Sequence, residues 1–314
     1  MEKYRFDDRV AIVTGAGRGI GRAYARLLGQ LGAKVVVNDL GGAMDGSGSD
    51  SGPAQLVAEE INEAGGTAIA DTSDISTVAG GRAPVEAALE HFGRIDVVVN
   101  NAGNVRFAGL PDVDVDIMES LLAVHVKGAF NTIHAAWPHM LEQNYGRIVI
   151  TSSIGMFGLP DNLAYATAKA AVLGMAKSMT QSVGDKDIKI NVILPNAMTR
   201  MAGGESEGMD SLREEGRDTT DIMDPELVAP MVGYLANEVC DVSGEAYLAG
   251  GGRYAHLFVG VTDGYLPSDP YAVTVEDVVA NVDRIKDRSG YYIPTSLLDC
   301  VGHYMAHRAG EHNE

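Results

Sequence analysis

Short apolar runs alternate with longer stretches of helical periodicity over about the first 250 residues of the chain. A short continuous run of Val, Ile and Ala is typical of a strand buried on both faces, as in parallel sheets. The stretches between the runs are long enough for the crossover helices that join parallel strands. The pattern therefore predicts an α/β fold. Strands are predicted at 10–13, 34–38, 67–70, 95–99, 147–150, 189–194 and 245–249, and helices up to about 32 and at 53–64, 81–92, 114–143, 165–183 and 225–236.

The alternation stops near Arg253, which predicts one domain over residues 1–255 and a C-terminal extension over residues 256–314. The extension has a clear helical pattern at 275–286, and we expect it to pack on the same domain or in an oligomer interface. Residues 201–221 are acidic and rich in Gly, Ser and Thr, which predicts a flexible segment.

A glycine turn joins the first predicted strand to the first predicted helix. Its glycines let backbone N–H groups approach a pyrophosphate at a helix N-terminus. Asp39 follows the second strand, eighteen residues after Gly21, where a carboxylate can accept a hydrogen bond from a ribose 2′-OH. Strand, turn, helix and acid together predict a dinucleotide site. Its residues are Gly15, Arg18, Gly19, Ile20, Gly21 and Asp39.

A tyrosine and a lysine four residues apart form a second candidate site. Tyr165 and Lys169 lie on one face of a predicted helix, one turn apart. An ammonium near a phenol lowers its pKa, so Tyr165 can act as general acid or base towards an alcohol or carbonyl. Ser152 and Ser153 follow the fifth strand, where a hydroxyl can face the carboxyl edge of the sheet. Taken alone, such a Tyr–Lys pair is more often an ordinary helix surface.

The composition excludes several classes of partner. The chain has 314 residues and a net charge of −19, which argues against nucleic acid or an anionic membrane. No apolar run reaches the roughly 20 residues of a membrane span, and the charged N-terminus does not have the pattern of a secretory signal. Cys240 and Cys300 lie far apart, so neither a disulfide framework nor a metal site is expected. These features favour a reducing, cytoplasmic location.

Together, these motifs resemble the short-chain dehydrogenase/reductase family over about residues 5–255. They follow one another as the glycine turn, Asn100-Asn101-Ala102-Gly103, a serine, Tyr165 with Lys169, and Pro195. The resemblance implies a doubly wound (Rossmann) sheet of about seven parallel strands with helices on both faces. It also implies hydride transfer between a nicotinamide ring and a substrate carbon. Tyr165 would then donate or accept the proton, and Lys169 would bind the nicotinamide ribose.

The resemblance assigns further residues to the cofactor. Asp74 and Ile75 match the pair that contacts the adenine, although Asp74 has a second interpretation as the cap of the next helix. The other positions that match cofactor contacts are Asn101, Ala102, Gly103, Pro195 and Ala197.

Two positions depart from the family pattern. The serine that orients the substrate oxygen is Ser153 by alignment from the fifth strand and Ser152 by the usual spacing to Tyr165, and we favour Ser153. His125 stands where most members have an asparagine that holds a water of the proton relay. It either substitutes in that relay or is simply packed in its helix.

The expected cofactor is NAD. The carboxylate of Asp39 binds a 2′-OH and repels the 2′-phosphate of NADP. Arg18 is the counter-argument, because a cation in the glycine turn can pair with that phosphate. It can equally face the pyrophosphate or solvent.

A further set of residues narrows the resemblance within the family. It consists of Asn38–Gly42 with the insertion after them, His125, Ala135–Trp137 with Met140, and Pro195–Ala197 with Arg200 and Met201. With this set the chain looks like the dehydrogenase module of the peroxisomal D-bifunctional β-oxidation enzymes, which oxidises (3R)-3-hydroxyacyl-CoA. We therefore expect a free-standing cytoplasmic homologue that oxidises a (3R)-3-hydroxyacyl-CoA.

A neutral substrate is the main alternative. If residues 201–221 form a substrate lid, their acidity does not favour a polyanionic CoA ester. A hydroxysteroid dehydrogenase or general carbonyl reductase would suit a lining of Met156, Phe157, Met198 and Met201, which can equally be core residues. A non-catalytic dinucleotide-binding scaffold is more remote, because it would not require the serine, tyrosine and lysine.

A homodimer or homotetramer is also implied by the resemblance. The helices at 114–143 and 165–183 would pack across a two-fold axis. Trp137 and Met140 belong either to that interface or to the core.

Overall fold

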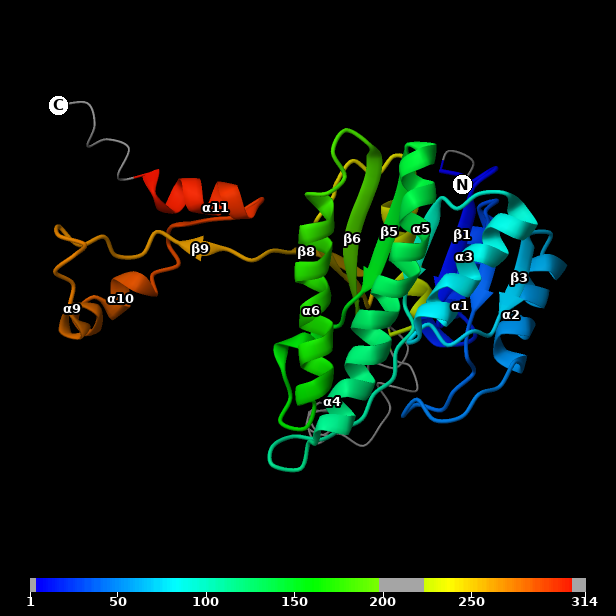
Figure 1. The fold of residues 1–314 in the computed structure, drawn as a ribbon, viewed down its shortest axis with the longest axis horizontal. Coiled ribbons are helices and arrows are strands. Elements are labelled where there is room, and N and C mark those ends of the chain that lie inside the picture. The colour runs from blue at the N-terminus through cyan, green and yellow to red at the C-terminus, as the bar shows by residue number, and fades with distance from the viewer. Residues whose placement is uncertain (1–3, 198–222, 307–314) are drawn as a thin grey trace. The chain divides into compact units, whose positions relative to one another are not determined.

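A computed structural model describes residues 4–197 and 223–306 (Figure 1). The chain divides after His256 into two compact units, Met1–His256 and Leu257–Glu314. Within the described ranges, no helix has the length and apolar character that crossing a bilayer requires.

The first unit is built on an eight-stranded sheet in the order β3-β2-β1-β4-β5-β6-β7-β8. Each neighbouring pair from β3 to β7 is parallel. The strand order reverses between β1 and β4, so the sheet is doubly wound, and the predicted α/β fold is confirmed. The strands are β1 (Val10–Thr14), β2 (Lys34–Asn38), β3 (Thr67–Asp71), β4 (Val97–Asn100), β5 (Tyr145–Thr151), β6 (Asp187–Pro195), β7 (Ala246–Gly250) and β8 (Arg253–Leu257).

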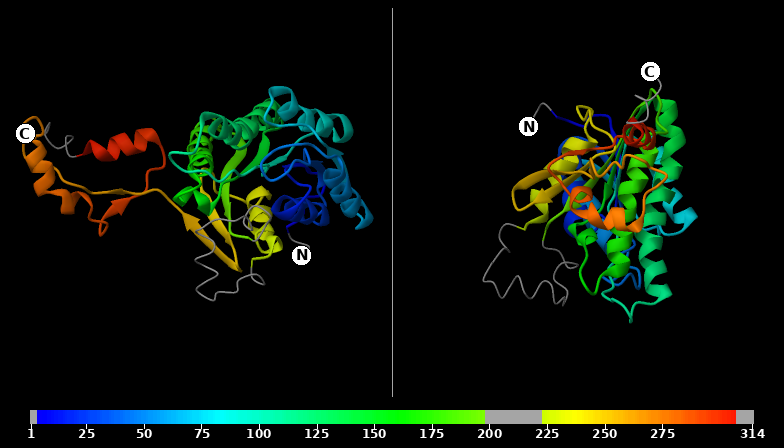
Figure 2. Two further views of the ribbon diagram at one scale, coloured as in Figure 1. Left: turned by 90° about the horizontal axis from the view of Figure 1, so that it is seen from below. Right: turned by 90° about the vertical axis from the view of Figure 1, so that its left-hand side faces the viewer.

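Helices cover both faces of this sheet (Figure 2). Helices α1, α2 and α8 pack on one face, and α3, α5 and α6 on the other. The helices of this unit are α1 (Gly19–Gln30), α2 (Gly52–Glu63), α3 (Val78–Phe92), α4 (Val115–Leu122), α5 (Ala129–Gln143), α6 (Leu163–Thr180) and α8 (Ala229–Ala236), with shorter turns η1 (Ala123–Gly128), η2 (Ile154–Phe157) and η4 (Pro225–Leu227).

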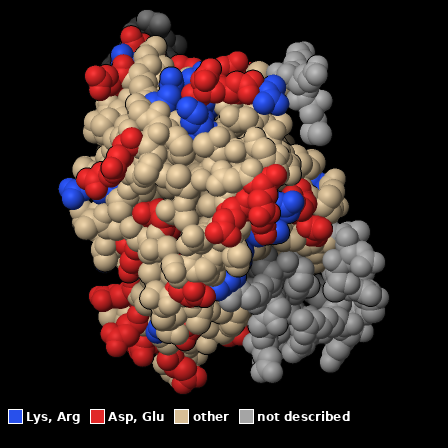
Figure 3. All heavy atoms as spheres, turned by 90° about the vertical axis from the view of Figure 1, so that its right-hand side faces the viewer, with Lys and Arg blue, Asp and Glu red and all other residues tan. Residues whose placement is uncertain are grey.

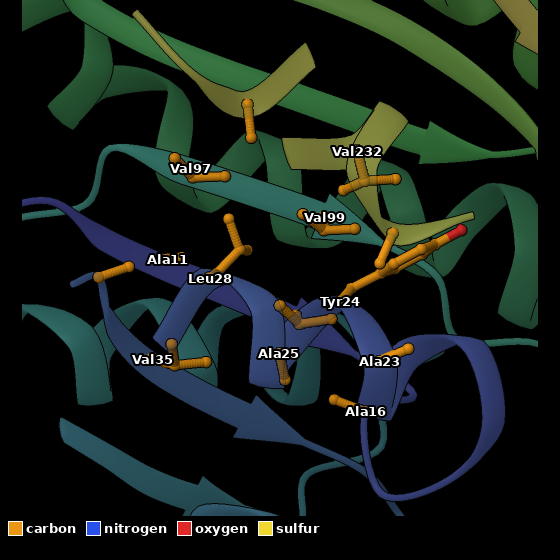
Figure 4. Close-up of a cluster of buried hydrophobic side chains, with 14 of the residues drawn as sticks. Ala11, Ala16, Ala23, Tyr24, Ala25, Leu28, Val35, Val97, Val99 and Val232 are labelled. Atoms are coloured by element: carbon orange, nitrogen blue, oxygen red, sulfur yellow. The ribbon is translucent and has the colours of Figure 1, made fainter. Parts of the chain in front are cut away.

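The core under α1 fixes the position of the first βαβ unit. Side chains of α1 such as Tyr24 and Leu28 face Val35 of β2 and Val97 and Val99 of β4 (Figure 4). All of these side chains are at most 1% exposed. Because β2 and β4 flank β1, this packing holds the N-terminus of α1 at the carboxyl end of β1.

The predicted elements differ from the observed ones within the long helix and at the start of the fourth strand. The stretch 114–143 is helical throughout, but η1 between α4 and α5 has the wider π-helical spacing. The observed fourth strand begins at Val97, two residues later than predicted, and both backbone groups of Ile95 bond the Gln143 side chain.

The eighth strand was not predicted. Strand β8 has no buried residue, so it lacks the apolar run that marks the other strands. Gly251 and Gly252, both with positive φ, join it to β7, and a connection of this length can join only antiparallel strands.

The second unit is small. Strands β9 (Val261–Thr262) and β10 (Tyr291–Tyr292) pair antiparallel, and the helices are α9 (Val275–Ala280), α10 (Val282–Ile285) and α11 (Leu297–Tyr304). The helix predicted at 275–286 is thus split at Asn281. None of the described residues of this unit is buried.

Candidate active site

A cleft of about 760 Å³ opens at the carboxyl ends of the strands, where the strand order reverses. This is the position at which doubly wound sheets bind ligands. All predicted site residues except His125 line it. They are Gly15, Arg18, Gly19, Ile20, Gly21, Asp39, Asp74, Ile75, Asn101, Ala102, Gly103, Ser152, Ser153, Tyr165, Lys169, Pro195 and Ala197.

The glycine turn between β1 and α1 leaves no room for side chains. A Cβ atom on Gly21 would lie 2.2 Å from the carbonyl oxygen of Gly15, and Gly15 itself has φ of +62°. The first helical bond of α1 is from the N–H of Arg22 to Arg18, so the N–H groups of Gly19, Ile20 and Gly21 have no helical acceptor. Arg18 at the N-cap supplies no side-chain cap. This open helix end at the cleft fits the phosphates of a dinucleotide.

Asp39 holds the turn in place. One carboxylate oxygen accepts from the N–H of Gly17 and the other from the N–H of Gly41, each at 2.7 Å. A carboxylate oxygen has two acceptor sites, so both retain capacity for a ribose hydroxyl. Asp39 thus has a structural task in addition to the role predicted for it.

The residues after β3 and β4 complete this half of the cleft. The Asn101 amide donates to the carbonyl oxygens of Thr14 and Gly15, both at 3.1 Å, which ties the end of β4 to the glycine turn. Asp74 does not cap α3. Thr77 does so, accepting from the N–H of Gly80.

The insertion after β2 forms a wall that the sequence did not predict. Residues 42–46 line the cleft beside residues 104–107. The two segments are joined by hydrogen bonds from the N–H of Val105 to Met44 (3.0 Å) and from Nε of Arg106 to Asp45 (3.1 Å), both to carbonyl oxygens. Arg18 donates to the carbonyl oxygen of Gly42 at 3.3 Å. A polar run of Gly, Ser and Asp has no periodicity from which this placement could be predicted.

Ser153, Tyr165 and Lys169 meet at the end of β5. Ser153 caps η2, and its Oγ accepts from the N–H of Gly155 at 3.0 Å, which leaves its proton free. Tyr165 lies in the first turn of α6, and Lys169 follows one turn later with Nζ 5.7 Å from the centre of the Tyr165 ring. The lysine is buried and donates to the carbonyl oxygen of Thr151 at 2.8 Å.

The two serines point to different partners. Ser152 is 1% exposed and donates through Oγ to the main-chain carbonyl of Lys169 at 2.7 Å. It therefore holds α6 against β5 and does not lie at the phenol. Ser153 acts on Tyr165 instead, because its hydroxyl lowers the pKa of the phenol. The alternative that made Ser152 the catalytic serine has no support in this geometry.

Burial dominates the protonation of this site. It raises the pKa of the Tyr165 phenol above its ordinary value, and the hydrogen bond from Ser153 lowers it in part. Burial also lowers the pKa of Lys169 to about 7. Burial thus outweighs the lowering of the phenol pKa that is expected from a neighbouring ammonium.

His125 lies behind the cleft. It belongs to η1, is 4% exposed, and its ring meets that of Tyr165 edge to face at 5.4 Å. Its Nε2 lies 2.8 Å from the carbonyl oxygen of Asn104, to which a protonated Nε2 donates, and 3.4 Å from the main-chain nitrogen of the same residue. Nδ1 is buried and has no hydrogen-bond partner among the described residues. Burial, and then the charge of Lys169, hold the pKa of His125 well below its usual value, against a smaller opposing effect of Asn104.

Part of the cleft lining is apolar, and among the described residues it includes Phe107, Ile154, Leu159 and Met223. Two of the residues predicted for this role, Met156 and Phe157, do not line the cleft. Met198 and Met201, together with the acidic stretch 201–221, lie outside the described residues.

Asn162 shapes the loop that leads into α6. It is buried just before α6, accepts from the N–H of Leu159 at 2.7 Å and donates to the carbonyl oxygen of Gly155 at 3.2 Å. In the sequence, Asn162 is marked only by its position three residues before Tyr165. An asparagine at that position cannot be distinguished from an ordinary helix N-cap.

Among the described residues, no three His, Cys, Asp or Glu side chains come together as a metal site.

Comparisons with known proteins agree with this architecture. Residues 9–209 match the family model described as short chain dehydrogenase. The chain is 40% identical over 287 residues to the peroxisomal multifunctional enzyme type 2 of Drosophila melanogaster. The matched region covers 89% of this chain and 46% of that protein. The chain thus spans about half the length of this relative.

Solved structures show the same similarity. The full-length fly enzyme superposes with a TM-score of 0.77 and 31% identity over 98% of this chain and 50% of that one. A short chain dehydrogenase from Mycobacterium avium superposes with a TM-score of 0.73 and 32% identity, over 90% of this chain and 97% of that one.

Proposed function

Since the chain belongs to the short-chain dehydrogenase family and is an oxidoreductase, we propose that it uses NAD to oxidise (3R)-3-hydroxyacyl-CoA to 3-oxoacyl-CoA. The observation that carries the reaction type is the meeting of Ser153, Tyr165 and Lys169 at the edge of the dinucleotide cleft. The substrate is proposed from the likeness to the multifunctional peroxisomal enzymes.

Tyr165 is the proposed general base for alcohol oxidation and general acid for the reverse reaction. Its hydroxyl is positioned by α6, and Ser153 donates a hydrogen bond that stabilises the phenolate. A substrate hydroxyl placed between the two is held by Ser153 and loses its proton to Tyr165. Lys169, with a pKa of about 7, changes charge near neutral pH beside the phenol.

A nicotinamide dinucleotide suits the donors of the cleft. The open N-terminus of α1 would hold its pyrophosphate, and Asp39, with free acceptor sites, would hold the adenosine ribose. When bound, the oxidised nicotinamide supplies the hydride acceptor. NAD is preferred because the charge of Asp39 repels a 2′-phosphate. Arg18 offers that phosphate a cation, which is the argument for NADP.

His125 is proposed as a positioning residue and not as a member of a proton relay. Its neutral ring packs against Tyr165 and its Nε2–H holds the carbonyl of Asn104. A group whose pKa lies well below neutrality stays uncharged through the working range.

A hydroxysteroid dehydrogenase or carbonyl reductase is the second candidate, favoured by the apolar wall of Phe107, Ile154 and Leu159. A non-catalytic scaffold is disfavoured, because binding alone would not require the serine, tyrosine and lysine to meet. A small-molecule substrate, a homo-oligomer and a cytoplasmic location complete the proposal.

A substrate panel tests the function. Purified protein with NAD is assayed on (3R)- and (3S)-3-hydroxybutyryl-CoA and on a hydroxysteroid. Formation of reduced cofactor with the (3R) ester, in large excess over the (3S) ester and the steroid, is expected. Preference for the steroid would move the assignment to the second candidate, and no turnover of any of them would reject both.

A further inference from the structure

One basic side chain lines the cleft between the insertion after β2 and the loop before α6. Among the described residues that line the cleft, the basic ones are Arg18, Arg106 and Lys169. Lys169 is buried at Tyr165, and Arg18 belongs to the glycine turn on the cofactor side. Arg106 lies three residues after Gly103, is partly exposed, and lines the cleft together with Phe107.

The guanidinium of Arg106 has donors to spare. Its Nε donates to the carbonyl oxygen of Asp45 at 3.1 Å. No hydrogen bond or ion pair to its two terminal nitrogens is found within the described ranges. A guanidinium has five N–H donors, four of them on these terminal nitrogens, and they form a planar fork that suits phosphate oxygens.

The backbone that carries Arg106 is anchored at two points. On one side, Val105 donates to the carbonyl oxygen of Met44 in the insertion. On the other side, Ala108 forms a parallel bridge with Asn162, in the loop that leads to Tyr165. The arginine is therefore held between the insertion and the loop before α6, so that little conformational freedom remains to be lost when it binds a ligand.

The overall charge makes a local cation necessary for a CoA ester. The chain carries a net charge of −19, and carboxylates of the described residues are spread over the face in Figure 3, where Lys and Arg form no continuous patch. Such a surface repels a ligand that carries several phosphate charges. A neutral steroid would gain nothing from Arg106, since it offers no anion to the fork.

We propose that Arg106 binds a phosphate of the CoA moiety through its terminal nitrogens and thereby selects CoA esters over neutral alcohols. This inference rests on the proposed function, because it assigns a recognition residue to the same reaction. Its role is in binding the non-reacting end of the substrate, so it acts on KM more than on kcat.

The test compares two substrates with the same reacting end. One is (3R)-3-hydroxybutyryl-CoA, and the other is the N-acetylcysteamine thioester of the same acid, which lacks the phosphates. The measured quantity is the ratio of kcat/KM for the CoA ester to that for the truncated thioester. It is determined for the wild type, Arg106→Gln and Arg106→Lys. Arg82→Gln is the matched control, because Arg82 is exposed on α3 and pairs with Glu86 away from the cleft.

In Arg106→Gln the ratio is expected to fall on the order of tenfold, through KM for the CoA ester, because a charge-assisted hydrogen bond is lost. Arg106→Lys should keep part of the ratio and Arg82→Gln all of it. Added salt should raise KM for the CoA ester in the wild type and much less in Arg106→Gln, since an exposed charge interaction is screened.

Two outcomes would overturn the inference while leaving the proposed function standing. One is an unchanged ratio in Arg106→Gln, with the wild type active on both thioesters. The other is an equal loss on both substrates together with a higher KM for NAD, which would make Arg106 a support of the insertion. A wild type inactive on both thioesters would instead reject the proposed function.

Discussion

At the scale of single residues, the site depends on which of two adjacent serines faces the phenol. The sequence favours Ser153 but keeps Ser152 as an alternative, because a strand end places one side chain on each face of the sheet and the pattern does not say where the strand ends. The structure gives the two serines different surroundings. Ser152 donates to the main chain of Lys169, whereas the Ser153 hydroxyl lowers the pKa of the Tyr165 phenol.

Replacing Ser153 should move the pH dependence of alcohol oxidation. The hydrogen bond from Ser153 lowers the pKa of Tyr165, so its removal raises that pKa, and the rise of kcat/KM with pH shifts to higher pH. A shift of the profile to higher pH is expected for Ser153→Ala. The measurement is the pH–rate profile. Ser152→Ala is the control, and a shift seen in Ser152→Ala instead would exchange the roles of the two serines.

His125→Asn should lower kcat/KM without changing the form of the pH–rate profile. The histidine is neutral and buried, so it supports Tyr165 and Asn104 by packing and by one hydrogen bond, which asparagine replaces in part. A loss on the order of tenfold is expected, with unchanged apparent pKa values. Disappearance of a kinetic pKa in the variant would show that His125 titrates during the reaction and belongs to a relay.

Asp39→Asn should reduce the preference for NAD over NADP. The carboxylate supports Gly17 and Gly41 as well as the ribose, so activity with both cofactors will fall and only their ratio is diagnostic. Because the repulsion of the 2′-phosphate is removed, the ratio of kcat/KM values should fall on the order of tenfold. Asp74→Asn, in the same cleft, should keep the wild-type ratio. A ratio unchanged in Asp39→Asn would assign cofactor choice elsewhere.

At the scale of elements, apolar patterning predicts the strands of the sheet and most helices around it, because parallel strands buried on both faces are continuous apolar runs. Three features have no such pattern. Strand β8 has no buried residue, and the insertion after β2 is polar and irregular. The sequence pattern of η1 is that of an ordinary α-helix. The insertion matters most, since it forms a wall of the cleft and holds Arg106.

Gly21→Ala should impair both folding and cofactor binding. An added methyl group would lie 2.2 Å from the carbonyl oxygen of Gly15 and 2.5 Å from the Asn101 amide, so α1 must shift from the turn. A destabilisation of about 1–3 kcal/mol is expected, with a higher KM for NAD. Thermal unfolding and steady-state kinetics measure the two effects.

Gly52→Ala is the control for this variant, because its added methyl group meets only the Asp50 side chain, at 3.2 Å. Equal stability and cofactor affinity of the two variants would mean that the turn tolerates a side chain, contrary to the tight approach described above.

At the scale of the whole molecule, the second unit has little means of stabilising itself. None of its described residues is buried, and large apolar side chains such as Leu297, Leu298 and Tyr304 are 70–81% exposed. The sequence predicts an extension but not how it packs. A short segment with no core of its own has no periodic pattern of apolar residues from which its buried positions could be predicted.

We expect the full chain to be a homo-oligomer. Helices α5 and α6 are proposed for the two-fold interface. Met140 on α5 is fully buried within its own unit, so it belongs to the core rather than to that interface. Light scattering after size exclusion should give the mass of a dimer or tetramer. The double variant Leu297→Ser/Leu298→Ser distinguishes whether the second unit contributes to assembly or packs on its own chain. A monomeric full chain would contradict the proposal.

The central claim is that Tyr165 exchanges the proton during hydride transfer, and Tyr165→Phe tests it most directly. The variant removes one hydroxyl and keeps the ring that packs against His125. Reduction of NAD by (3R)-3-hydroxybutyryl-CoA is measured alongside NAD binding. The account predicts a loss in kcat on the order of a hundredfold to ten-thousandfold with NAD affinity retained. Turnover of Tyr165→Phe at the wild-type rate would contradict it.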